Sequence, residues 1–168
     1  LHTLGKRVIV NAAWVPGVTS DTSVTQLIAS GVDGVSLEMG FSSSVRNDIT
    51  RINKAMTQYR RMLDSGLTVV FVGLGSATGQ PDTIENIEAE QRVEAAYGMM
   101  FRKPGDRLFT NEIFWRPIPE WADWPSRFGA PVGAASVTRN DAGEVVMTRA
   151  FANTTLTLNV ATMTVAYT

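Results

Sequence analysis

Apolar and polar positions along the first two-thirds of the chain follow two alternating patterns. Short apolar runs lie at 6–12, 34–38 and 67–73, and each leads into a polar or glycine-rich segment. Between them, apolar residues recur every three or four positions, most clearly from Ile49 to Leu63. The runs predict buried strands, and the periodic stretches predict amphipathic helices. Strand and helix therefore alternate three times, which is typical of a parallel sheet with helices packed on it.

Capping residues indicate where the expected helices begin and end. Ser, Thr, Asp and Asn side chains accept hydrogen bonds from the first turn, and glycine readily ends the last one. The expected first and last markers are Asp21 or Thr22 with Gly31, Asn47 or Asp48 with Gly66, and Thr83 with Phe101.

The pattern changes after Phe101. Residues 108–115 predict one more strand or a short helix, and the segment 117–131, rich in Pro and Trp, is expected to be irregular. The remainder alternates apolar and polar residues and predicts antiparallel strands at 132–136, 145–151, 155–159 and 162–166. The expected organisation is a βα-repeat domain over 1–116, a linker over 117–131 and an antiparallel β appendage over 132–168.

Composition excludes several classes of protein. The 168 residues carry a net charge of −1 and no polybasic segment, so neither nucleic acid nor an anionic membrane is an expected partner. No apolar run is long enough to span a membrane. The chain has no Cys and one His, so we expect no metal site and no cofactor that depends on those ligands. The compartment is not fixed, and a secreted protein or part of an extracellular or viral assembly is compatible with the sequence.

Candidate chemistry lies where the strands end, because parallel α/β folds bind ligands at the carboxyl ends of their strands. Glu38 ends an otherwise apolar run, where burial would raise its pKa and suit it to general acid catalysis. The alternative is a glutamate that is solvated or hydrogen-bonded to neighbouring backbone amides. Asp33, just before the same run, is expected to cap the preceding loop.

Several other residues follow strand ends and are candidates for substrate binding. Asn11 can donate a hydrogen bond to a ligand hydroxyl or cap its own loop, and Glu112 is a second carboxylate if its segment is a strand. Aromatic faces can stack on sugar rings or simply pack at the rim of the core, and these candidates are Trp14, Phe41 and Trp115.

The glycines after the third run do not form a nucleotide-binding motif. The segment 73–79 has glycines at 73, 75 and 79, but no Lys-Ser/Thr pair follows them. The spacing therefore matches neither a P-loop nor the dinucleotide fingerprint, and nucleotide binding is the least favoured alternative.

The order of several short motifs resembles the second half of a glycoside-hydrolase-like (β/α)8 barrel family of uncharacterised bacterial and viral proteins, which carries a small C-terminal β appendage. Each motif is weak alone, and the resemblance depends on their order over most of the chain. The motifs are Gly5-Lys6-x-Val8-Ile9-x-Asn11, Asp33-Gly34-x-x-x-Glu38, Tyr97-x-Met99-x-Phe101, Gly129-x-Pro131-x-Gly133 and Arg149-x-Phe151-x-Asn153.

The resemblance implies an α/β fold made of a partial, half TIM-type (β/α) barrel and an antiparallel β appendage. It also implies that Glu38 is the sixth-strand acid/base of a glycosidase, whose partner acid on the fourth strand would precede Leu1. A half barrel has open sheet edges, so we expect completion by a missing N-terminal half, a second polypeptide or a homo-oligomer partner.

Two functions follow from these expectations. The first is hydrolysis of a glycosidic bond, with carbohydrate as the substrate. The second is a non-catalytic carbohydrate-binding or structural module of a larger assembly. The missing partner acid and the threonine-rich C-terminal strands favour the second function, because such strands suit edge pairing with another chain.

Overall fold

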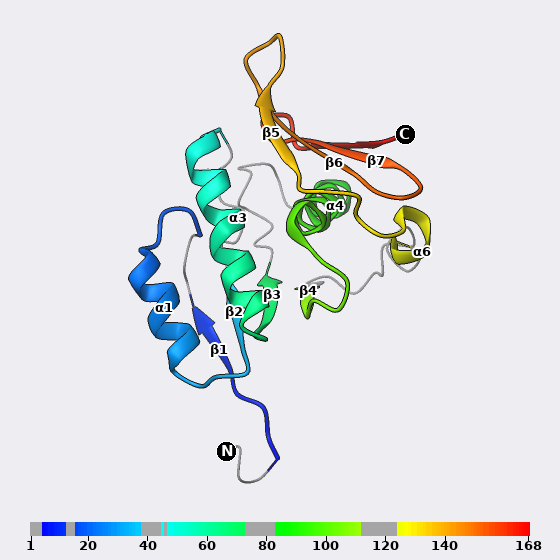
Figure 1. Ribbon diagram of the computed structural model, residues 1–168. Coiled ribbons are helices and arrows are strands. Elements are labelled where there is room, and N and C mark those ends of the chain that lie inside the picture. Colours follow the sequence, from blue (N-terminus) through cyan, green and yellow to red (C-terminus); the bar gives the residue numbers. More distant parts are fainter. Residues whose placement is uncertain (1–4, 13–15, 38–44, 46, 73–82, 112–123) are drawn as a thin grey trace.

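A computed structural model describes residues 5–12, 16–37, 45, 47–72, 83–111 and 124–168. It contains a parallel and an antiparallel sheet with helices between them (Figure 1). The parallel strands are β1 (Ile9–Ala12), β2 (Gly34–Leu37), β3 (Thr68–Val72) and β4 (Leu108–Asn111). The helices that the described residues form include α1 (Asp21–Ala29), α3 (Ile49–Asp64), α4 (Ile84–Phe101) and the short α6 (Trp124–Phe128).

The parallel sheet has its strands in chain order, β1-β2-β3-β4. Right-handed crossovers that always step in the same direction place their helices on the same face of a sheet. Val35 and Val69 point to that face and are fully buried, and α3 packs against β3. The fold is therefore α/β, with the four parallel strands and alternating helices of half a (β/α) set.

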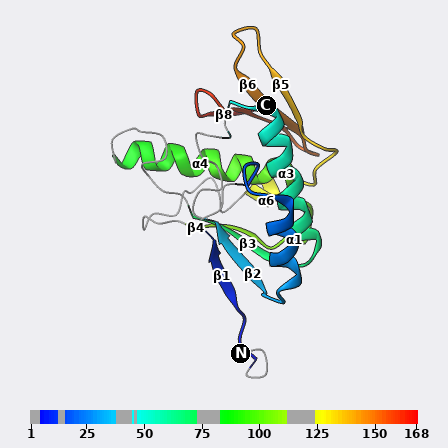
Figure 2. The same cartoon turned by 90° about the vertical axis from the view of Figure 1, so that its left-hand side faces the viewer.

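The antiparallel sheet packs on the outer side of the helices. Its strands are β5 (Ser136–Arg139), β6 (Val145–Ala150), β7 (Thr155–Asn159) and β8 (Thr164–Tyr167), paired in that order. Contacts from β6, β7 and β8 to α4, and from β5 to α3, join this sheet to the helix layer. Figure 2 shows α4 running beneath the antiparallel sheet and above the parallel one.

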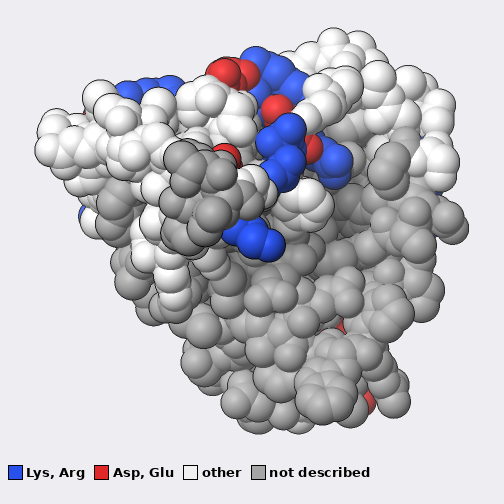
Figure 3. Space-filling model, turned by 90° about the horizontal axis from the view of Figure 1, so that it is seen from below, with Lys and Arg blue, Asp and Glu red and all other residues white. Residues whose placement is uncertain are grey.

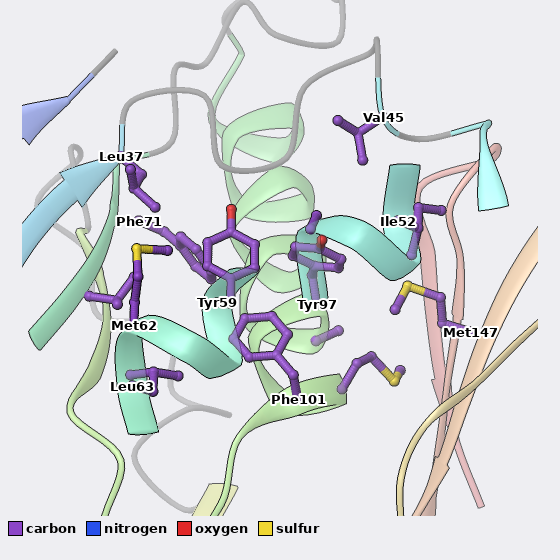
Figure 4. Close-up of a cluster of buried hydrophobic side chains, with 14 of the residues drawn as sticks. Leu37, Val45, Ile52, Tyr59, Met62, Leu63, Phe71, Tyr97, Phe101 and Met147 are labelled. Atoms are coloured by element: carbon purple, nitrogen blue, oxygen red, sulfur yellow. The ribbon is translucent and has the colours of Figure 1, made fainter. Parts of the chain in front are cut away.

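A continuous apolar core joins the layers. Four aromatic rings from α3, β3 and α4 form its centre, where Tyr59 stacks on Phe101 at 4.8 Å and meets the edge of Phe71 at 5.0 Å (Figure 4). Tyr97 packs edge-on against Tyr59 and Phe101. Offset and edge-on pairs add stabilisation beyond burial, and burial raises the pKa of the Tyr59 and Tyr97 hydroxyls well above the ordinary value.

Local signals explain most helix boundaries. Of the two caps expected for α3, Asp48 is the one formed, and the expected helix start at Thr83 proves to be the N-cap of α4; each side chain accepts a hydrogen bond from the first turn. For α1, the cap is Ser20 instead of Asp21 or Thr22, because the Ser20 hydroxyl accepts from the Ser23 amide at 3.1 Å.

Two expectations about the C-terminal third differ from the structure. The segment 117–131 was expected to be irregular; its residues 117–123 lie outside the described residues, and 124–128 form the short helix α6, whose Phe128 is fully buried. The strand expected at 132–136 begins at Ser136 and continues to Arg139, because its register is fixed by pairing with β6. No helix among the described residues is long and apolar enough to cross a membrane.

Candidate functional site

The carboxyl edge of the parallel sheet is the place that the sequence assigns to chemistry. Of the predicted site residues, only Asn11 is described, and it lies on β1 with an exposed side chain. Glu38, Trp14, Phe41, Glu112 and Trp115 lie outside the described residues. Glu38 directly follows Leu37, the fully buried last residue of β2.

The register of the strands shows which residues lie in the same row of the sheet as Asn11. Asn11 pairs with Ser36, Ser36 with Val70, and Val70 with Phe109. Because side chains alternate along a strand, this row points away from the fully buried Val35 row and its helices. We call this side, which also carries Ile9, the far face of the parallel sheet.

The far face carries large apolar side chains at both outer strands. Ile9 on β1 is 49 % exposed, and Phe109 on β4 is 56 % exposed. Apolar side chains line the interior of a closed (β/α) barrel, where they are buried. Ile9 and Phe109 are therefore apolar, as residues inside a closed barrel are, but here they are exposed because they lie on the outer strands of an open sheet.

Asp33 lies at the opposite, amino edge and has a structural role there. Its carboxylate accepts a hydrogen bond from the Val8 amide at 2.6 Å, and its own amide donates to the Val8 carbonyl at 2.9 Å. The Asp33 carbonyl accepts from Thr68 at 2.9 Å. Asp33 thus ties β1, β2 and β3 together where they begin, instead of only capping its loop.

Two of the C-terminal motifs also have a structural explanation, because they pair with each other. Pro131 and Phe151 form an isolated antiparallel bridge, flanked by hydrogen bonds from Val132 to Ala150 and from Ala152 to Ala130. Gly129 has φ +72°, and a Cβ there would lie 3.0 Å from that of Ala152. The glycine at this position is therefore required by both conformation and space.

Arg149 connects these motifs to the end of α4. Its Nη1 donates to the carbonyls of Met99 and Arg102 at 2.7 and 2.8 Å, and its Nε donates to Gly133 at 2.8 Å. The last carbonyls of a helix have no partner within the helix and carry partial negative charge. Burial lowers the pKa of Arg149, but these carbonyls satisfy the guanidinium.

Ion pairs surround the same helix end. Arg60 of α3 donates to the Phe101 carbonyl at 3.1 Å and forms salt bridges with Asp106 and Asp64. Desolvation lowers the pKa of Arg60, but the hydrogen bonds to the two carboxylates outweigh it and the pKa is raised. The Arg60 hydrogen bond lowers the pKa of Asp64, and Lys103 pairs with Asp64 at 3.1 Å.

An open cavity of about 630 Å³ lies beside this helix end. It is at the beginning of β4, away from the carboxyl edge where the sequence predicts catalysis. Its walls come from α4, the α4–β4 turn, β4 and the paired C-terminal motifs. They include Gly98, Met99, Arg102, Lys103, Leu108, Phe109, Ala130, Pro131 and Phe151.

Comparisons with known proteins assign no family. No family model matches the chain, and no curated protein matches it with significant similarity.

The sequence did not predict the cavity. Its described walls come from three separate stretches of the chain, 95–109, 129–131 and Phe151, so no single motif marks it. The local signal is the run Arg102-Lys103-Pro104-Gly105 after an apolar helix. Among the described residues, no group of three or more acidic or His side chains is placed to hold a metal ion.

Proposed function

We propose that this chain is half of a (β/α)8-type barrel that hydrolyses glycosidic bonds, with Glu38 as the general acid/base. The observation that carries the proposal is the strand order β1-β2-β3-β4, with helices on one face. In barrels, the ends of such strands hold the catalytic groups. Glu38 follows the strand whose last residue, Leu37, is fully buried.

The proposal gives each candidate residue a chemical role. Protonated Glu38 donates its proton to the leaving oxygen of the glycosidic bond. If the configuration is retained, the resulting carboxylate then takes a proton from the attacking water; if it is inverted, the partner carboxylate does so. Asn11 lies at the same edge and can bind a sugar hydroxyl. Trp14, Phe41 and Trp115 supply stacking surfaces, and Glu112 is a further hydrogen-bond acceptor for the sugar.

The mechanism needs a second carboxylate, which the proposal assigns to the polypeptide that completes the barrel. The two carboxyl groups must stand about 5–5.5 Å apart for retention of configuration, or about 6.5–9.5 Å for inversion. Exposed Ile9 and Phe109 at the outer strands support completion, because a partner would bury both.

The test is hydrolysis of a panel of fluorogenic methylumbelliferyl glycosides by the chain in its assembled form. We expect Glu38→Gln to lower kcat at least about a hundredfold, as for loss of a general acid. Glu85→Gln, on the exposed first turn of α4, is the matched control and leaves kcat unchanged. Equal activity of Glu38→Gln and the parent chain, with both folded by circular dichroism, contradicts the proposal.

A second candidate function is a non-catalytic module of a larger assembly. It is favoured by the antiparallel sheet, whose outer strand β8 pairs on one side with β7 and is largely exposed. Such an edge can accept a strand of another chain. This function predicts no hydrolysis of any glycoside in the panel, with association retained when Glu38 is replaced.

A further inference from the structure

The cavity beside the end of α4 has the properties of a ligand site. Its volume of about 630 Å³ lies within the range of small-molecule pockets, which are mostly apolar and hold a few polar groups. Its apolar walls include Met99, Leu108, Pro131 and Phe151.

Among the described residues that line the cavity, the charged side chains are cationic. Arg102 and Lys103 line it, and Lys103 is held by Asp64. The half-buried Arg102 follows the last residue of α4, and within the described part of the chain its guanidinium has no carboxylate partner. A hydrogen bond between a guanidinium and an anion is stronger than a neutral one, and burial of an apolar ligand body against apolar walls adds to it.

Within the part of the chain that the structure describes, the charged side chains around the end of α4 carry an excess of positive charge. Four cations surround the helix end, namely Arg60, Arg102, Lys103 and Arg149, and two carboxylates, Asp64 and Asp106, pair with Arg60 and Lys103. The helix carbonyls that would otherwise attract Arg102 are already bonded to Arg60 and Arg149. Figure 3, the view from below, shows basic and acidic side chains lying side by side in the upper part of this face.

We propose that this cavity binds an organic acid with an apolar body, whose acid group pairs with Arg102. The apolar body lies against Met99, Leu108, Pro131 and Phe151. The site is distinct from the carboxyl edge of the sheet, so it stands whether or not the chain cleaves glycosides.

The experiment compares two fluorescent probes that differ in one group, anilinonaphthalene sulfonate and the uncharged phenylnaphthylamine. We expect Arg102→Gln to weaken binding of the sulfonate about tenfold, the scale of a charge-assisted hydrogen bond, and to leave the uncharged probe within about twofold. Arg107→Gln, an exposed arginine near the cavity but outside its lining, is the matched control and changes neither affinity.

A second variant tests the walls of the cavity. Ala130→Trp places an indole in the cavity and leaves the hydrogen bond between the Ala130 carbonyl and Ala152 intact. We expect it to abolish binding of both probes, with the thermal midpoint checked to confirm folding. Unchanged sulfonate affinity in Arg102→Gln, unchanged binding in Ala130→Trp, or no binding to the parent chain overturns the proposal.

Discussion

Arg149 shows how a single residue joins the antiparallel sheet to the helix layer. It is 6 % exposed, and its three described hydrogen bonds end on carbonyls, two of them at the end of α4. A buried charge is costly unless it is fully hydrogen-bonded, and the carbonyls are costly without it. The buried guanidinium therefore needs these carbonyls as acceptors, and the carbonyls need Arg149 as their donor.

Replacing Arg149 by Met should lower the free energy of unfolding by about 2–4 kcal/mol, because buried carbonyls lose their donors. The measurement is urea unfolding at pH 7. Arg139→Met is the matched control, since Arg139 also donates to two carbonyls, of Gly143 and Asn47, but is exposed. Its loss should cost less than about 1 kcal/mol, and equal losses in both variants would contradict a role for burial.

Glu144 provides a prediction about pH at the residue scale. Hydrogen bonds from Asn140 and Asn159 hold its pKa below the ordinary value of 4.5. A lowered carboxyl pKa gives stabilisation that is present above the ordinary pKa and is lost as pH falls through the folded pKa. An NMR titration of the Glu144 carboxyl should therefore show a midpoint below 4.5, and Asn159→Ala should raise it. An unchanged midpoint in that variant would show that the Asn159 contact has no effect.

At the scale of elements, Gly34 determines how closely β2 approaches β3. A Cβ at this position would lie 2.6 Å from the Thr68 carbonyl oxygen and 2.9 Å from the Thr68 Cβ. Because the nearest atom belongs to the backbone of β3, a Cβ at position 34 could be accommodated only if β2 and β3 moved apart. The Asp-Gly pair of the sequence motif thus has a packing explanation, with Asp33 tying the strand ends together and Gly34 allowing their contact.

Gly34→Ala should therefore lower the free energy of unfolding by about 1–3 kcal/mol, the range of overpacked cores. Gly133→Ala is the comparison, because a Cβ at Gly133 meets nothing within 4 Å and its backbone is not left-handed. That change should leave the thermal midpoint close to that of the parent chain. The measurement is differential scanning calorimetry of the two variants and the parent chain. A Gly34→Ala variant as stable as the parent chain would mean that β2 and β3 are not packed this closely.

Elements with a local signal were predictable from the sequence, and those set by tertiary contacts were not. The helix α3 combines an apolar stripe with the Asp48 cap, so both its presence and its start follow from the sequence. The start of β5 depends on its pairing with β6, and α6 depends on burial of Phe128 under Phe151 and Tyr167. The role of Asn11 and the five other site candidates stays a prediction.

At the scale of the molecule, the layers differ in how well they are covered. Helices α3 and α4 have a sheet on either side, and the antiparallel sheet is anchored through β6, β7 and β8. The parallel sheet has outer strands β1 and β4, which each pair with one neighbour among the described residues. Unpaired edges and exposed apolar side chains together favour association with another chain.

The far face gives the last prediction, which concerns assembly. If a second copy completes the barrel, each β1 edge meets a β4 edge, all eight strands run parallel about a two-fold axis, and Ile9 and Phe109 become buried. We expect the chain to associate in sedimentation velocity experiments at micromolar concentration, and Ile9→Lys to shift it to the monomer, because a lysine cannot be buried there without a partner. Val18→Lys is the matched control, since Val18 is 51 % exposed but precedes α1 instead of lying on the sheet. A parent chain that remains monomeric would exclude completion by a second copy, and the completing half must then be a different polypeptide or a further segment of a longer one.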